Sequence, residues 1–218
     1  FTEISAIQRL FSAGKIHSTL YTGKSATEES FKYLTVDRKS PEIIHIATHG
    51  FFFPVIKTEY DNQEKEIFRG VLADKPAFTI SDNPLFRSGL LLAGASRTWS
   101  NLQAIPGVED GTLTAYEVSN LNLHNTRLVV LSACETGLGD IHGSEGVYGL
   151  QRAFKMAGVQ YMIISLWQVP DYQTSELMQL FYSDCLRGMN IKDAFRNAQQ
   201  TMRYKYDPFY WAAFVLVE

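Results

Sequence analysis

The sequence predicts an α/β fold with a mainly parallel sheet flanked by helices. Short apolar runs rich in β-branched residues, at 42–50, 127–132 and 161–167, are typical of strands buried on both faces. Segments with apolar residues at helical spacing separate these runs, and parallel strands need such crossover connections. The chain has 218 residues, of which 45% are hydrophobic and 13% aromatic. We therefore expect one globular domain over residues 1–218.

Capping residues and apolar spacing predict five helices. They are expected to begin near Thr2, Thr27, Ser144, Asp171 and Asn190. Gly14 and Gly158 are placed to end the first and third of them, because glycine readily adopts the left-handed conformation of a helix C-terminus.

Three more segments are expected to form strands. They are 16–23, 89–94 and 211–217, the last of which contains Trp211. In parallel sheets, ligands bind at the carboxyl ends of the strands. His49 and Cys134 follow two of the buried runs, so they are the first positions to consider as a site.

Charge and composition argue against several partners. A net charge of −3 and a pI near 6.0 give no electrostatic reason to expect nucleic acid or an anionic membrane. Two cysteines do not make a disulfide framework, and the longest apolar runs are too short to span a bilayer. We expect a cytoplasmic protein. The start at Phe1, without an initiator methionine, predicts that the chain is part of something longer.

His49 and Cys134 have the side chains that nucleophilic catalysis needs. A thiol attacks a carbonyl as the thiolate, with a base to take its proton and backbone donors to hold the oxyanion. The two residues lie 85 positions apart, and neighbouring strands would bring them together. By spacing alone, a core cysteine and a loop histidine remain an open alternative. Cys185 lies among apolar residues of a helix and is interpreted as packing.

Other chemistries fit the sequence less well. Glycines between 137 and 146 could cradle a phosphate, but a dinucleotide fingerprint needs a glycine where His142 stands, and no P-loop string occurs. A serine-hydrolase elbow at Ser144 fails at the same histidine. The histidines and Cys134 lack the paired spacing of metal ligands, so we expect no metal and no cofactor. His45 is expected to point inward from its strand.

Several motifs, in order along the chain, resemble the CHAT domain, a caspase-like module named for its association with tetratricopeptide repeats. They are "HIATHG" (45–50), "DGTLTAYEVSNLNL" (110–123), "LVVLSACETGLG" (128–139), "GSEGVYGLQRAFKMAGV" (143–159), "SLWQVPDYQTSELMQLFY" (165–182) and "YWAAFVLVE" (210–218). The resemblance covers nearly the whole chain. It implies a caspase-like three-layer sandwich and a cysteine endopeptidase with a Cys-His dyad.

The resemblance also implies roles for individual residues. His49 matches the family histidine and Cys134 the family nucleophile, while the backbone N–H groups of Gly50 and Cys134 would hold the oxyanion. Glu135 and Asp140 could favour a basic residue in the substrate, or be solvated loop charges, and both readings stay open. Trp167 follows another strand and is a further candidate for the substrate pocket.

The connection at 54–87 is the longest in the sequence. Its 34 residues include 11 charged side chains. Pro54, Gly70, Pro76 and Pro84 are expected to interrupt regular secondary structure along it. We expect a mobile regulatory loop, with a passive surface insertion as the alternative. The resemblance implies that upstream tetratricopeptide-type repeats or a regulatory protein gate the domain.

The expected partner is a protein or peptide substrate. Two other functions remain open from the sequence. The first is a catalytically silent caspase-like module that binds partner proteins, because a fold does not fix a function. The second is a small-molecule hydrolase or transferase with a cysteine nucleophile.

Overall fold

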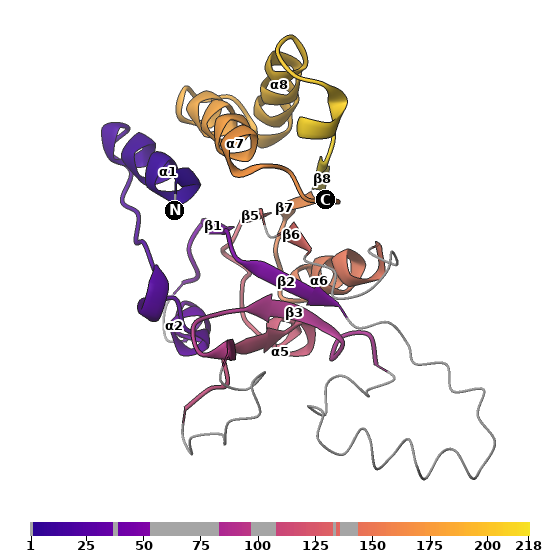
Figure 1. Cartoon of the computed structure of the whole chain (residues 1–218). Coiled ribbons are helices and arrows are strands. Elements are labelled where there is room, and N and C mark those ends of the chain that lie inside the picture. The colour runs from indigo at the N-terminus through magenta and orange to yellow at the C-terminus, as the bar shows by residue number, and fades with distance from the viewer. Residues whose placement is uncertain (1, 37–38, 53–82, 97–107, 133, 136–143) are drawn as a thin grey trace, which may run out of the picture.

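Figure 1 presents the computed structural model, which describes residues 2–36, 39–52, 83–96, 108–132, 134–135 and 144–218. No helix within these ranges is both long enough and apolar enough to cross a membrane. Of the connection at 54–87, all but residues 83–87 lies outside the described residues.

The centre of the fold is a four-stranded sheet. Its strands are β1 (Ile43–Ile46), β5 (Leu128–Leu131), β7 (Tyr161–Ser165) and β8 (Phe214–Val217), in the order β1-β5-β7-β8. The first three strands run parallel, and β8 pairs with β7 in the antiparallel direction. The prediction of an α/β fold with a mainly parallel sheet is confirmed.

Helices cover both faces of this sheet, which makes three layers (Figure 1). One outer layer contains α1 (Thr2–Ala13), α7 (Asp171–Leu186) and α8 (Ile191–Arg203), and the other contains α2 (Glu28–Tyr33), α5 (Ala115–Ser119) and α6 (Ser144–Met156). Leu128 and Val130 pack with buried side chains of α7 and α8, whereas Val129 and Leu131 pack with those of α6. Successive residues of a strand point to opposite faces, so a fully apolar strand needs cover on both sides.

A second four-stranded sheet continues from the first. Its strands are β2 (His49–Phe52), β3 (Ser88–Leu91), β4 (Thr112–Thr114) and β6 (Cys134–Glu135), in the order β4-β3-β2-β6. β2 begins three residues after β1 ends, and β6 begins three residues after β5 ends. The parallel pair β1 and β5 is therefore followed by the parallel pair β2 and β6.

Capping signals located the helices well. Thr27 and Asn190 cap α2 and α8 through their side chains, as expected. Gly158 has a φ of 103° just after α6 and ends it as predicted. At the end of α1, however, the left-handed residue is Lys15, with a φ of 56°, rather than Gly14. Asp171 is the first residue of α7 and does not cap it.

Three strand predictions were wrong in detail. The run at 42–50 is two strands with a bend between them. Residues 16–23 form no strand, and the last of them, Gly23, begins the short helix η1 (Gly23–Ser25). Ile16 in that segment is 49% exposed, so its alternation of apolar and polar residues does not reflect burial against a partner strand. Trp211 precedes β8 and follows η3 (Pro208–Tyr210).

Candidate active site

The candidate site lies where the first sheet passes into the second. In the parallel pair β2 and β6, His49 is in register with Cys134, and Gly50 with Glu135. Neighbouring strands lie roughly 4.8 Å apart, so the backbones of the two proposed catalytic residues are adjacent. The fold thus brings together two positions that are 85 residues apart in the sequence.

Hydrogen bonds fix both chain segments that lead from the first sheet into the second, one after β1 and one after β5. The hydroxyl of Thr48 donates to the carbonyl of Leu91 on β3, at 2.5 Å. The backbone N–H of Ser132, directly after β5, donates to the carbonyl of Ile46 at the end of β1, at 3.0 Å. Each segment is thereby fixed within two residues of a proposed catalytic position.

His49 and Gly50 differ in exposure. His49 is exposed, so its imidazole is open to solvent, whereas Gly50 is buried. A Cβ atom added at Gly50 would meet the carbonyl oxygen of Gly89 at 3.6 Å, which is ordinary contact. The described neighbours therefore give no packing reason for a glycine here.

The remaining predicted pocket residues are spread over several elements. Glu135 lies in β6, opposite Gly50, and Asp140 lies outside the described residues. Trp167 follows β7 and is 38% exposed. Its indole N–H donates to the carbonyl of Phe209 at 3.0 Å, and the two rings stack with centroids 6.4 Å apart. Trp167 is thus held against η3.

Cys185 has the properties of a packing residue, as expected. It lies in α7, partly buried against the core of that layer. Burial raises the pKa of its thiol to about 11, and the carboxylate of Asp184 adds to this effect. A thiol with so high a pKa is almost fully protonated near neutral pH, so it is a poor nucleophile.

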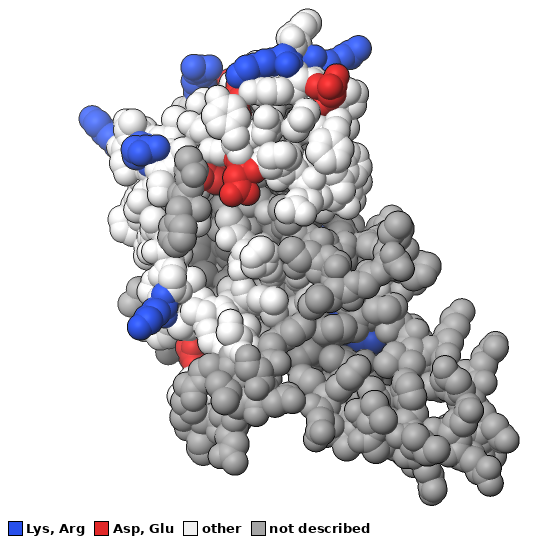
Figure 2. Space-filling model, in the orientation of Figure 1, with Lys and Arg blue, Asp and Glu red and all other residues white. Residues whose placement is uncertain are grey.

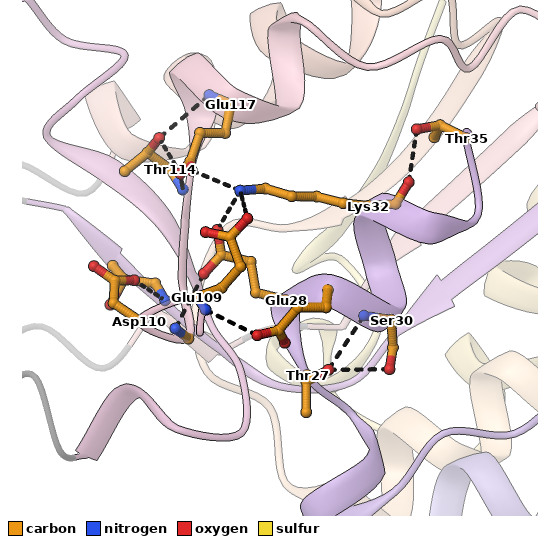
Figure 3. A network of polar contacts seen from close by, with 12 residues as sticks. Thr27, Glu28, Ser30, Lys32, Thr35, Glu109, Asp110, Thr114 and Glu117 are labelled. Carbon is orange, nitrogen blue, oxygen red and sulfur yellow. Dashed lines mark hydrogen bonds and ion pairs between the residues drawn. The ribbon is translucent and has the colours of Figure 1, made fainter. Parts of the chain in front are cut away.

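A cluster of carboxylates lies beside the second sheet (Figure 3). Glu28, Glu109 and Glu117 offer oxygen atoms within 4.8 Å of one another, a spacing that suits a cation. The ammonium of Lys32 lies 2.7, 2.9 and 2.9 Å from these three carboxylates, in that order, so it already supplies the positive charge. The cluster joins α2 to α5 and to the chain before β4, and it was not foreseen from the sequence.

Burial and hydrogen bonds within the cluster shift the pKa values of three of its members. Burial raises the pKa of Glu28 to about 7, although its hydrogen bond with Lys32 acts in the other direction. Burial also opposes ionisation of Glu117, but hydrogen bonds from Thr114 and Lys32 outweigh it and lower that pKa. For Lys32, hydrogen bonds to the three carboxylates outweigh burial and raise the pKa. Of these three groups, Glu28 is the one whose pKa lies near neutral pH.

We expect the stability of the protein to fall as the pH rises from about 5 to about 7, with Glu28 as one cause. The folded state holds the Glu28 proton more tightly than the unfolded chain, whose carboxyl has a pKa near 4.5. This contribution is complete below pH 4.5 and is lost as the pH passes through 7. Glu28→Gln should flatten the dependence of the unfolding temperature on pH between 5 and 7.5. A slope equal to that of wild type would contradict the assignment.

Glu176→Gln is the matched control. Although burial opposes its ionisation, hydrogen bonds from Lys205 and Tyr206 lower the pKa of Glu176. Its stabilising effect is therefore lost only as the pH falls below the ordinary carboxyl range. The slope between pH 5 and 7.5 should stay as in wild type.

Basic side chains are unevenly distributed over the described surface. On the face that Figure 2 shows, most visible Lys and Arg side chains gather at the end of the molecule formed by α1, α7 and α8. β2 lies toward the other end in the same view. On this face, the described basic side chains are therefore concentrated on the layer of α1, α7 and α8.

Residues 2–218 match the CHAT domain family. The chain belongs to this family. The CHAT domain is also similar to tetratricopeptide repeat protein 28 of mouse, with 31% identity over 116 residues, and of human, with 33% identity over 115 residues. Each match covers 51% of this chain and 5% of the relative. The matched segment is therefore about half of this chain and a small part of these tetratricopeptide repeat proteins.

Proposed function

We propose that this CHAT domain is a cysteine endopeptidase that acts through Cys134 and His49. The observation that carries the proposal is their register on adjacent parallel strands. Family membership supports it, because the two residues stand in the motifs "THG" and "SAC" at 48–50 and 132–134. The exposure of His49 leaves its imidazole accessible to a substrate.

The proposed reaction has two halves. His49 takes the thiol proton, and the Cys134 sulfur attacks the carbonyl carbon of a peptide bond, whose π electrons move to the oxygen. The tetrahedral intermediate collapses, the C–N bond breaks, and His49 gives the proton to the leaving amine. Water then attacks the resulting thioester with His49 as base, which releases the carboxylic acid and restores the thiol.

The oxyanion of each tetrahedral intermediate needs donors that are already in place. We assign this role to the backbone N–H groups of Gly50 and Cys134. Glu135 and Asp140 are proposed to face a basic substrate residue, and Trp167 to border the pocket. The net charge of −3 gives no electrostatic reason to prefer a polyanion over a protein substrate.

Control by an upstream region is part of the proposal. The two relatives are named as tetratricopeptide repeat proteins, and the matched segment is 5% of each. We propose that residues 1–218 act as one domain in a longer protein. A repeat region or its ligand would then order the connection at 54–87, and so control access to His49.

An electrophilic peptide tests the proposal directly. A peptide with a C-terminal acyloxymethyl ketone should label the intact protein at Cys134, as mapped by mass spectrometry, and His49→Ala should slow labelling at least tenfold. Cys185→Ala should label like wild type. Labelling of Cys134 that is indifferent to His49, without turnover of any peptide, would instead favour the silent interaction module. Thioester turnover without peptide cleavage would favour a small-molecule hydrolase or transferase.

A further inference from the structure

A buried polar network joins α1 to the chain segment that leads to Cys134. The carboxylate of Glu3 lies 3.1 Å from His45 Nε2 through one oxygen and accepts a hydrogen bond from the Ser132 hydroxyl through the other, at 3.0 Å. His45 Nδ1 lies 3.0 Å from the hydroxyl of Tyr182 on α7. Glu3 and Tyr182 are buried, and the side chain of His45 is 8% exposed.

The donors and acceptors of this network match. The buried phenol of Tyr182 keeps its proton, because burial and the Glu3 carboxylate both raise its pKa. With a neutral His45, Tyr182 can donate to Nδ1 while Nε2 donates to Glu3. Glu3 then accepts one hydrogen bond on each of its two oxygens. A buried carboxylate is costly without partners, so both donors are needed to keep it in place.

Ser132 is the member of the network closest to the proposed nucleophile. It lies two residues before Cys134, in the gap between β5 and β6. Its backbone N–H donates a hydrogen bond to the carbonyl of Ile46, and its hydroxyl donates one to the carboxylate of Glu3. Ser132 therefore ties the approach to β6 both to β1 and to α1.

The docking of α1 supports the same connection. α1 packs along α7, where the ring of Phe11 meets that of Tyr182 edge-on with centroids 5.0 Å apart. Ile7 belongs to the core between this helix layer and the sheet. A shift of α1 would move Glu3 away from Ser132, and the start of β6 would lose a support.

We propose that Glu3 and Ser132 are positioning residues for Cys134, and that α1 is the element through which the preceding part of the protein acts on the site. This inference rests on the proposed peptidase function and deepens it by naming a route of control. The route is short: a carboxylate on α1, one hydroxyl, and two residues of chain to the nucleophile. A network that only fastens α1 to the fold is the competing explanation.

The test compares Ser132→Ala with Tyr182→Phe in the intact protein. Each variant removes one hydroxyl from the same network, but only Ser132→Ala breaks the link from Glu3 toward β6. Ser132→Ala should lower kcat at least tenfold with little change in KM, because Ser132 supports the nucleophile rather than the substrate. Tyr182→Phe should keep kcat within twofold. Ser132→Thr, which retains a hydroxyl, should recover most of the activity.

The rate at which iodoacetamide alkylates Cys134 is a readout that needs no peptidase activity. It should change at least threefold in Ser132→Ala and in Glu3→Gln, and stay within twofold of wild type in Tyr182→Phe. The inference would be overturned if the alkylation rate in all three variants changed only in proportion to their loss of unfolding temperature, with no separate effect of Ser132→Ala and Glu3→Gln. If wild type cleaves no peptide but the alkylation rates separate as stated, the proposed function fails and the positioning role stands. If Ser132→Ala does not fold, the alkylation rate of Cys134 in Glu3→Gln, compared with that in Tyr182→Phe, decides between the positioning role and a network that only fastens α1.

Discussion

Cys134→Ala is expected to lower peptide cleavage by at least about a thousandfold and to leave the unfolding temperature within a few degrees of wild type. The loss follows because no acyl-enzyme can form without the thiolate. The fold should persist, since β6 is a two-residue strand at the edge of the second sheet and the change removes one sulfur atom. Turnover of a peptide library and thermal unfolding measure the two effects.

Cys185→Ala is the matched control for this prediction. Cys185 lies in α7 with a thiol whose pKa burial raises to about 11, so it should contribute nothing to turnover. A modest loss of stability is expected, because the side chain packs against the core. If Cys185 proved essential and Cys134 dispensable, the assignment of the nucleophile would be wrong.

The first sheet could be predicted because its strands are apolar on both faces. Residues 128–131 and 162–164 are fully apolar, and such a run is stable only between two helix layers. Capping residues such as Thr27 and Asn190 then set the ends of helices by local hydrogen bonds. These signals are local, so they can be found in one sequence without knowledge of the tertiary fold.

The second sheet was harder to predict because its strands are short and depend on distant partners. β4 and α5, at 112–119, were missed, although Thr114 and Glu117 form a capping box that the sequence contains. The bend after β1 depends on contacts of Thr48 and Ser132 with other strands. Such contacts leave no periodic pattern in the chain.

The candidate site was predictable in its residue types but not in its surroundings. The positions of His49 and Cys134 after buried strands indicated that they could meet, and the strand register now supports that hypothesis. The link from Ser132 to Glu3 joins residues 129 positions apart, and nothing near either residue indicates the other. The inward orientation of His45 was expected and is confirmed, but its partners came from the fold.

His49→Ala is expected to suppress cleavage about as strongly as Cys134→Ala, again with little loss of stability. The imidazole is exposed, so its removal leaves no cavity in the core. A dyad acts as a unit, because the thiolate without a proton donor and the base without a thiol are each nearly inactive. His17→Ala, at another exposed histidine, should leave the rate unchanged.

The double variant separates a dyad from two independent contributions. If His49 acts only by moving the proton of Cys134, the loss in the double variant should equal the loss in Cys134→Ala alone. The four values of kcat/KM, for wild type, both single variants and the double variant, complete the cycle. Losses that multiply would mean that His49 binds substrate or supports the backbone by itself, since its effect would then persist after the thiol had gone.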